Sequence, residues 1–291
     1  MITALIVLAL AMSNPVAATH TDQIGVASHV FNYVVVVVME NHGLNQVIDS
    51  SSAPFMNHLT AISSLATNYT AIDHPSLPNY LGLISGQDFY SWSVNDCSPN
   101  PGCSAGAAQN IVDSIEHRGL TWKAYMEGYP SSCGTHCSPG GCFLGDDSTN
   151  MYAARHDPFV YFDDIVNSTT RCSRIVPANA TGQAVADGAL LSDLSSPSTA
   201  SNLMWLTPNL CNDTHDCPIA TGDNYLSQLV PKILSTKVFE HQKAALFITF
   251  DEGVQSYPKR DLVYSVWTGP VVKQNFQSNN PYSHYSFLST I

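Results

Sequence analysis

Two stretches of the chain are almost entirely apolar, and each ends directly on polar or charged side chains. Five consecutive valines lie within residues 33–39, and the second stretch, AALFITF, covers residues 244–250. β-Branched residues favour extended backbone, and an apolar run without alternating polar positions is typical of a strand buried on both faces. We predict that both stretches are central strands of a parallel sheet.

The rest of the chain alternates between helical and extended periodicity. Helices are predicted over 54–65, from about 77, over 105–119, 185–194 and 223–234, and further strands over 120–127, 202–208 and 261–269. Such alternation indicates an α/β fold with a mostly parallel central sheet and helices on both faces. A segment rich in Gly, Pro and Cys interrupts the alternation at 133–147. Because there is no internal repeat or low-complexity linker, we expect one domain with loop insertions.

The two ends of the chain carry their own signals. Residues 1–18 combine an apolar core with the small residues Val16-Ala17-Ala18, although the usual basic start is missing. This favours a secretory signal over 1–18, followed by a single domain over 19–291. An uncleaved anchor is the alternative, but the apolar run is short against the roughly 20 residues that span a bilayer, so no stable membrane insertion is expected. The final HYSFLSTI opens a helix without a stop signal, which favours a truncated C-terminus.

The charge balance narrows the class of partner. The 291 residues include 11 Lys and Arg against 23 Asp and Glu, which gives a formal net charge of −12. A chain this acidic is a poor candidate for nucleic-acid binding, so no nucleic-acid partner is expected. Hydrophobic residues make up 44%, enough for a substantial core, and charged residues only 12%, which is low for a cytosolic protein. The oligomeric state is left open.

The eight cysteines favour export, because an even number in an exported chain is typical of disulfides. Local clustering predicts the pairs Cys97–Cys103 and Cys211–Cys217. The other four cysteines are left unassigned. The motif CGTHCSPGGC also fits a zinc knuckle, but bridges are favoured in a secreted chain.

Four Asn-x-Ser/Thr sequons fit an extracellular glycoprotein. They lie at Asn68, Asn167, Asn179 and Asn212. Glycans there would supply solubility that the low content of charged residues does not.

The chemistry is concentrated where the two apolar strands end. Glu40-Asn41-His42 follow the first strand, and Asp251-Glu252 follow the second. Parallel strands deliver such residues to one sheet edge, where carboxylates repel each other unless a cation lies between them. Polar turns are the alternative, but two such strand ends favour a divalent metal ion. Oxygen ligands suit Mg²⁺, Mn²⁺ or Ca²⁺, and histidine would admit Zn²⁺.

A third segment, IDHPSLPNYLGLISG, places Ser76 before Leu77-Pro78 and an apolar helical run. We predict that Ser76 is the helix N-cap, since Ser is favoured there and Pro in the first turn. The same position suits catalysis, because a helix N-terminus attracts phosphate and a metal ion would activate the serine as a nucleophile. His74 and Asn79 lie close enough in sequence to bind phosphate oxygens.

Seven blocks of sequence, in order, resemble a known family. They are VVVVVMENHGLNQV, HPSLPNYLGLISG, TWKAYMEGYP, RHDPFVYF, TPNLCNDTHDCPIATGDNYL, LFITFDEG and YSHYSFLSTI. The chain resembles the phosphoesterase family of secreted acid phosphatases and non-haemolytic phospholipases C, and especially its fungal acid phosphatase-like members. This resemblance implies a metal-dependent phosphoester hydrolase on an alkaline-phosphatase-like α/β sandwich.

The resemblance also implies roles for single residues. Glu40, Asn41, Asp251 and Glu252 match metal-ligand positions, and Ser76 matches both the nucleophile and a further ligand. His156 and His215 match histidines near the phosphate, and His284 matches a further histidine of the site. A disulfide between Cys211 and Cys217 would fix the direction of His215, and His42 would support the metal ligands from behind.

These observations favour a secreted acid phosphatase that acts on small phosphomonoesters through a serine nucleophile. A phospholipase C-type phosphodiesterase is the first alternative, although no basic or apolar membrane-facing stretch favours it. A secreted binding protein without turnover is the second, and the intact site residues argue against it. A serine hydrolase of the esterase kind is disfavoured, because the G-x-S-x-G match GCSAG over 102–106 does not follow a predicted strand as a nucleophile elbow does.

Overall fold

The five valines lie at the centre of the sheet, as their lack of polar neighbours predicts. The computed structural model describes residues 30–178, 188–254 and 261–291. Strand β1 (Tyr33–Met39) pairs in parallel with β6 (Leu203–Thr207) on one side and with β7 (Ala244–Phe250) on the other. Every residue of β7 and all but the first of β1 are buried, so these strands form the core of the sheet.

The main sheet contains eight strands and is mostly parallel, which confirms the predicted fold class. Its order is β5 (Ile175–Pro177), β4 (Trp122–Met126), β6, β1, β7, β8 (Ser265–Thr268), β2 (Ser64–Ala66) and β9 (Phe276–Ser278). The strands from β5 to β7 are parallel, whereas β8 is antiparallel to both of its neighbours. A separate two-stranded sheet pairs β10 (Tyr282–Ser283) with β3 (Tyr69–Thr70).

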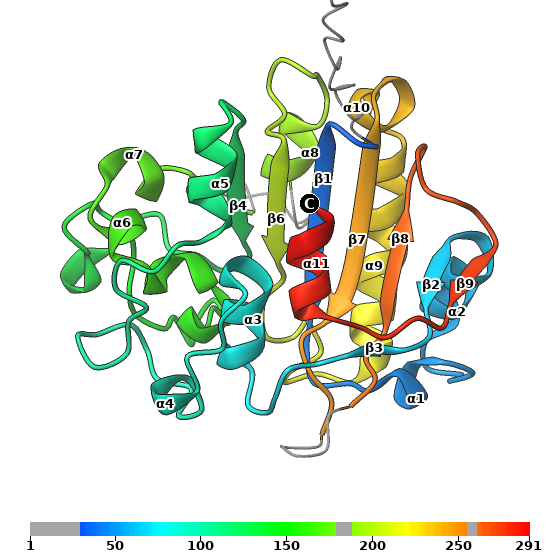
Figure 1. Cartoon of the computed structure of the whole chain (residues 1–291), viewed down its shortest axis with the longest axis horizontal. Coiled ribbons are helices and arrows are strands. Elements are labelled where there is room, and N and C mark those ends of the chain that lie inside the picture. Colours follow the sequence, from blue (N-terminus) through cyan, green and yellow to red (C-terminus); the bar gives the residue numbers. More distant parts are fainter. Residues whose placement is uncertain (1–29, 179–187, 255–260) are drawn as a thin grey trace, which may run out of the picture.

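Helices cover both faces of the sheet (Figure 1). Helices α3 (Leu77–Ser85) and α11 (His284–Thr290) lie on the face nearer the viewer, and α9 (Ile219–Leu234) lies behind β7 and β8. Helix α2 (Pro54–Ile62) packs against α9. No helix in the described part of the chain has both the length and the apolarity to cross a bilayer.

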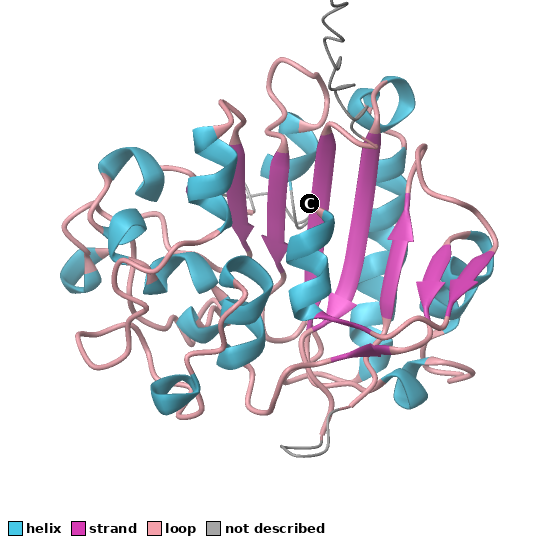
Figure 2. Cartoon of the chain, viewed as in Figure 1, coloured by secondary structure: helices cyan, strands magenta, loops and turns pink. Residues whose placement is uncertain are grey.

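The remaining helices are short. They are α1 (Leu44–Val47), α4 (Tyr90–Ser93), α5 (Ile111–His117), α6 (Asp163–Val166), α7 (Thr169–Cys172), α8 (Gly188–Asp193) and α10 (Lys237–His241). Between β4 and β5 the chain consists of loops and short helices, including the 3₁₀ turns η1 (Gly134–His136), η2 (Ala154–His156) and η3 (Pro158–Tyr161) (Figure 2).

Three predicted helices have different ends in the structure. The helix predicted over 54–65 stops at Ile62, because Ser63 is extended and the next residues form strand β2, which pairs with β8 and β9. The helix predicted over 105–119 begins only at Ile111, where the Asn110 side chain accepts the Val112 N–H as N-cap. The helix predicted over 223–234 starts one turn earlier and continues through Pro231.

The predicted signal over 1–18, the sequon Asn179 and the first residues of the helix predicted over 185–194 lie outside the described residues.

All eight cysteines form disulfides, so the zinc-knuckle alternative is wrong. The predicted pairs Cys97–Cys103 and Cys211–Cys217 are both present. The four cysteines left unassigned pair as Cys133–Cys137 and Cys142–Cys172. The second of these ties the excursion after β4 to helix α7, a long-range link that spacing alone does not indicate.

Candidate active site

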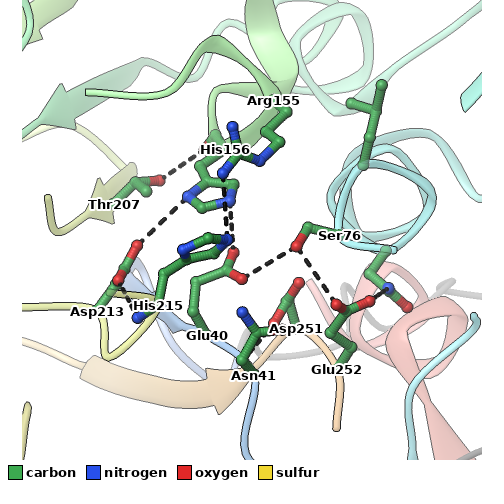
Figure 3. Close-up of polar contacts among 12 residues, drawn as sticks. Glu40, Asn41, Ser76, Arg155, His156, Thr207, Asp213, His215, Asp251 and Glu252 are labelled. Carbon is green, nitrogen blue, oxygen red and sulfur yellow. Dashed lines mark hydrogen bonds and ion pairs between the residues drawn. The ribbon is translucent and has the colours of Figure 1, made fainter. Parts of the chain in front are cut away.

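The carboxyl ends of β1 and β7 bring the two predicted pairs of polar residues together. Met39 and Phe250 are partners in the parallel register, so Glu40-Asn41 and Asp251-Glu252 leave the sheet side by side. The Asn41 N–H donates to Asp251 Oδ1 at 3.2 Å. Asn41 has a φ of 65°, in the left-handed region that Asn tolerates better than most residues. Figure 3 shows Glu40, Asn41, Asp251 and Glu252 grouped below Ser76.

The Ser76 hydroxyl points at carboxylates and does not cap its helix. It donates to Glu40 Oε2 at 3.0 Å and lies 3.5 Å from Glu252 Oε1. The predicted N-cap hydrogen bond is therefore wrong. Ser76 itself has helical dihedral angles (φ −61°, ψ −46°), and Asp96 Oδ1 accepts the Leu77 N–H in its place. With the cap supplied by another segment, the serine hydroxyl remains available to the site.

His156 lies between two buried carboxylates. Its Nε2 is 3.2 Å from Glu40 Oε1, and its Nδ1 is 3.3 Å from Asp213 Oδ2. The His156 ring stacks on the Tyr80 ring, with centroids 5.3 Å apart. His156 is the last residue of the 3₁₀ turn η2. Burial lowers the pKa of His156 well below its ordinary value, with Arg155 and His215 as smaller causes. The structure thus brings the predicted His156 to Glu40.

Asp213 was not predicted. It is fully buried, its carbonyl accepts the Glu40 N–H at 2.8 Å, and its Oδ1 accepts the His215 N–H at 2.7 Å. The only signal in the sequence was its position in CNDTHDC, next to a histidine already selected. That motif holds three Asn or Asp residues, so spacing alone could not single out Asp213.

His215 lies at the exposed side of this cluster, on the loop that the Cys211–Cys217 disulfide closes. Its Nδ1 lies 2.7 Å from Asp216 Oδ1, and its Nε2 lies 3.1 Å from the Arg155 guanidinium. Since the guanidinium can only donate, Nε2 accepts and Nδ1 carries the proton. One ligand atom each from Glu40, His156 and His215 lies within 4.8 Å of the other two, so these three side chains could hold a metal ion.

Both oxygens of Glu252 face protein donors. His74 Nδ1 lies 2.5 Å from Oε1, and Asn79 Nδ2 donates to Oε2 at 3.2 Å. Asn79 is fully buried, and its Oδ1 accepts the backbone N–H groups of Ile72 and Asp73. The structure therefore gives Asn79 a role in shaping the loop before Ser76, and its contact with phosphate stays a prediction. The His74 side chain is 38% exposed and remains open to a substrate.

His284 lies behind the site. Its Nε2 is 2.5 Å from the Asp251 carbonyl oxygen, and its Nδ1 is 3.3 Å from the Tyr69 hydroxyl. Burial lowers the pKa of His284 to about 4, so the neutral ring donates from Nε2 and accepts at Nδ1. The predicted site residue thus supports the backbone of Asp251. His42 has a similar position behind Glu40, with Nδ1 3.0 Å from its carbonyl oxygen.

Four carboxylates are packed together here with little or no access to solvent. They are Glu40, Asp213, Asp251 and Glu252. The pKa of Glu40 is raised well above its ordinary value, chiefly by burial and then by the charge of Asp251. Burial likewise raises the pKa of Asp251 to about 7 and that of Glu252 to about 11. A bound cation would offset the free-energy cost of ionising these buried carboxylates.

The donor atoms fit a divalent ion. Among the described residues, four buried atoms of the site make no hydrogen bond, namely Glu40 Oε1, Asp213 Oδ2, Asp251 Oδ2 and His156 Nε2, although the first two lie 3.2 Å and 3.3 Å from the His156 ring nitrogens as ion-pair contacts. Buried polar atoms without a partner are rare and point to an unfilled role, such as metal ligation. Carboxylate oxygens suit a hard ion such as Mg²⁺, Mn²⁺ or Ca²⁺, while the two imidazoles also admit Zn²⁺.

Known proteins with similar sequences are phosphatases. Phosphatidylinositol-3-phosphatase of Mycobacterium tuberculosis is 30% identical over 275 residues, which cover 92% of this chain and 79% of that protein. A probable acid phosphatase of Kluyveromyces lactis is 27% identical, with coverage of 94% and 62%. The phosphate-repressible acid phosphatase of Penicillium chrysogenum is 28% identical, with coverage of 78% and 50%. The chain thus spans only about half to three fifths of these two fungal relatives.

The fold is shared with solved structures of low sequence identity. A protein of the alkaline phosphatase superfamily from Vibrio parahaemolyticus superposes with a TM-score of 0.58 at 9% identity, covering 88% of this chain and 64% of that chain. Lipoteichoic acid synthase LtaP of Listeria monocytogenes gives 0.58 at 8% identity, with coverage of 89% and 72%. The predicted alkaline-phosphatase-like sandwich is confirmed. Residues 47–291 match the model of the Phosphoesterase family, and the chain belongs to that family.

Proposed function

We propose that this chain is a divalent-metal-dependent phosphatase that cleaves phosphomonoesters through Ser76. One observation carries the proposal: the Ser76 hydroxyl, which does not cap its helix, donates to a buried carboxylate in a cluster where four buried atoms make no hydrogen bond within the described residues. Family membership supports phosphoric esters as the substrate class. Relatives named as phosphatases support monoesters over the phospholipase C-type diester reaction.

The residues that would hold the metal ion are those around Ser76. Glu40, Asn41 and Asp251 lie at the two strand ends, and the Ser76 oxygen lies 3.0 Å from Glu40 Oε2. His156 and His215 could add nitrogen ligands on the Glu40 side. Glu252 is committed to His74 and Asn79, so we assign it a weaker part in ligation than the sequence predicted. A bound divalent ion would lower the pKa of the serine hydroxyl and stabilise the charge that develops on the phosphoryl oxygens.

The reaction would proceed in two displacements. Ser76 Oγ attacks phosphorus, its proton passes to the carboxylate that accepts its hydrogen bond, and the bond from phosphorus to the leaving oxygen breaks. Water then attacks phosphorus, the bond from Ser76 Oγ to phosphorus breaks, inorganic phosphate leaves, and the carboxylate returns its proton to Oγ. We assign protonation of the leaving oxygen to His74, whose side chain is 38% exposed, because His215 Nε2 accepts from Arg155 and its Nδ1 faces Asp216. His156 is too deeply buried for this role.

Arg155 supplies positive charge that the sequence reasoning missed. Its guanidinium lies 3.1 Å from His215 Nε2, and its Nε lies 3.8 Å from Asp96 Oδ2 (Figure 3 shows it above His156). Four buried carboxylates would repel a phosphate dianion, and a divalent ion alone does not balance them. We therefore assign Arg155 to the phosphoryl oxygens of the substrate.

The four disulfides support an oxidising compartment, and with the predicted signal over 1–18 we infer a secreted protein. Asn167 is exposed and remains a predicted glycosylation site, as does Asn68. Asn212 stays a predicted site too, and its amide donates one hydrogen bond to the buried Glu127.

The test is an assay of purified protein on p-nitrophenyl phosphate and on bis(p-nitrophenyl) phosphate, with chelator and after return of Mg²⁺, Mn²⁺, Ca²⁺ or Zn²⁺. We expect hydrolysis of the monoester that chelator abolishes and one of the ions restores. Faster cleavage of the diester would favour the phosphodiesterase, and full activity in metal-free protein would contradict the proposal.

A further inference from the structure

A third strand also ends on a buried carboxylate, and the proposed mechanism does not use it. Glu127 follows β4 directly within the block TWKAYMEGYP, and its backbone N–H donates to Thr207 O at the end of β6. The side chain is 1% exposed. Since burying a carboxylate costs free energy, its place at the same sheet edge as Glu40 calls for a compensating role.

Glu127 accepts hydrogen bonds from the first residues of the loop 209–217. Its Oε2 accepts the Asn209 N–H and the Asn212 Nδ2–H, both at 2.9 Å. The Asn209 side chain in turn accepts the N–H groups of Cys211 and Asn212 at 3.0 Å. These contacts fix the first residues of the segment 209–217, which the Cys211–Cys217 disulfide closes.

The far side of the same loop is attached to the active site. Asp213 accepts the Glu40 N–H and faces His156, and the Thr214 hydroxyl donates to the Glu40 carbonyl at 2.7 Å. Thr214 has a φ of 82°, which is unfavourable for a β-branched residue and persists only when its surroundings hold it. The loop is therefore held at two ends, by Glu127 and by the residue after β1.

We propose that Glu127 is a positioning residue that, with Asn212, holds Asp213 and His215 in register with Glu40 and His156. The catalytic consequence rests on the proposed function, whereas the effect on the loop does not. Glu127 acts as a hydrogen-bond acceptor through Oε2, a role that a glutamine amide oxygen can fill and an alanine cannot. Its Oε1 makes no hydrogen bond within the described residues, so the amide group of a glutamine should cost some stability there without releasing the loop. A metal ligand or a proton donor at this position would instead lose its function in both variants.

The experiment compares Glu127→Gln, Glu127→Ala and Asn212→Ala with the wild type, all enzymatically deglycosylated. Asp193→Ala is the matched control, because that carboxylate also accepts two hydrogen bonds from β4, from Lys123 Nζ and Tyr125 Oη, outside the cluster of site residues. The readouts are hydrogen exchange of peptides covering 209–217, the melting temperature, and kcat and KM for p-nitrophenyl phosphate with the activating ion.

We expect faster exchange confined to 209–217 in Glu127→Ala and Asn212→Ala. In Glu127→Ala, kcat should fall by about 10- to 100-fold, the range typical of residues that orient ligands, with little change in KM. Glu127→Gln should keep the loop protected and retain most of kcat. Asp193→Ala should lower the melting temperature without either local effect.

Two results would overturn the proposal. One is an equal loss of kcat in the Gln and Ala variants with a protected loop, which assigns Glu127 to ligation or proton transfer. The other is exchange that rises throughout the chain, or in no segment, in the variants that fold. If Glu127→Ala fails to fold, Asn212→Ala and Glu127→Gln decide the question. If the wild type proves to have no phosphatase activity, the exchange data still test whether Glu127 holds the loop 209–217.

Discussion

The Ser76 hydroxyl donates a hydrogen bond of 3.0 Å to Glu40 Oε2, which joins the start of α3 to the residue that follows β1. The same Glu40 faces His156 through its other oxygen, at 3.2 Å. One buried carboxylate thus links the candidate nucleophile to a histidine that Asp213 holds from the other side. Because these contacts come from four separate segments, a change in any one of them should affect the others.

Removal of metal should destabilise the protein more as pH rises. Burial raises the pKa of Asp251 to about 7 and of Glu252 to about 11, so the metal-free folded state binds more protons than the unfolded state above about pH 4. Its stability therefore falls as pH rises from about 4 through 7, whereas a bound cation favours the ionised carboxylates. Melting temperatures with chelator and with the activating ion should diverge from pH 4.5 to pH 8. A difference that stays constant over this range would contradict the account of the cluster.

Opening the Cys211–Cys217 disulfide should lower activity more than stability. A bridge across a separation of 6 residues contributes only about 2–3 kcal/mol to the free energy of unfolding. Its loop, however, carries Asp213 and His215. A double Cys→Ala variant should stay folded by circular dichroism and lose most of its kcat. The matched control removes Cys133–Cys137, a bridge of similar size outside the site, and should keep its activity. Equal losses in both variants would show that the loop has no special role.

Arg155→Ala should weaken the binding of monoesters in particular. A monoester dianion carries more charge than a diester monoanion, so loss of the guanidinium should raise KM for p-nitrophenyl phosphate more than KM for the diester. Arg174→Ala, which removes an arginine that binds Glu116 outside the site, is the control. A KM unchanged for the monoester would leave Arg155 as a structural partner of His215 and Asp96 only.

Asp96→Ala should lower mainly the stability of the protein, and Ser76→Ala should lower mainly its turnover. Asp96 accepts the first free N–H of α3, so its loss should cost about 1 kcal/mol of stability and leave residual turnover. Ser76→Ala removes no cap and should keep the fold, yet turnover should fall by orders of magnitude. Denaturant unfolding and kcat on the same samples separate the two effects. Wild-type turnover in Ser76→Ala would remove it as the nucleophile.

The sequence predicted the parts of this site that depend on regular structure. Glu40 and Asp251 could be brought together because unbroken apolar runs predict neighbouring parallel strands, and such strands deliver their carboxyl ends to one edge. His215 could be selected because a short disulfide loop limits where it points.

The residues that were missed depend on contacts between irregular segments. Asp96 caps α3 from a loop 19 residues away, and Asp213 meets His156 across two loops, neither of which shows a periodic pattern. The cap was assigned to Ser76 because local propensity favours Ser there, but a carboxylate from another segment took that role and left the hydroxyl to the site. Glu127 was visible at the end of a predicted strand, and only the structure shows what its oxygens bind.

The most direct test of the central claim is to trap the covalent intermediate. Protein that turns over a phosphomonoester with the activating ion is quenched in acid, digested, and analysed by mass spectrometry. The account predicts one phosphate on the peptide that contains Ser76, absent from Ser76→Ala and from chelated protein. Undetectable phosphoserine, together with inversion of configuration at phosphorus, would contradict it, since direct attack by water inverts and two successive displacements retain.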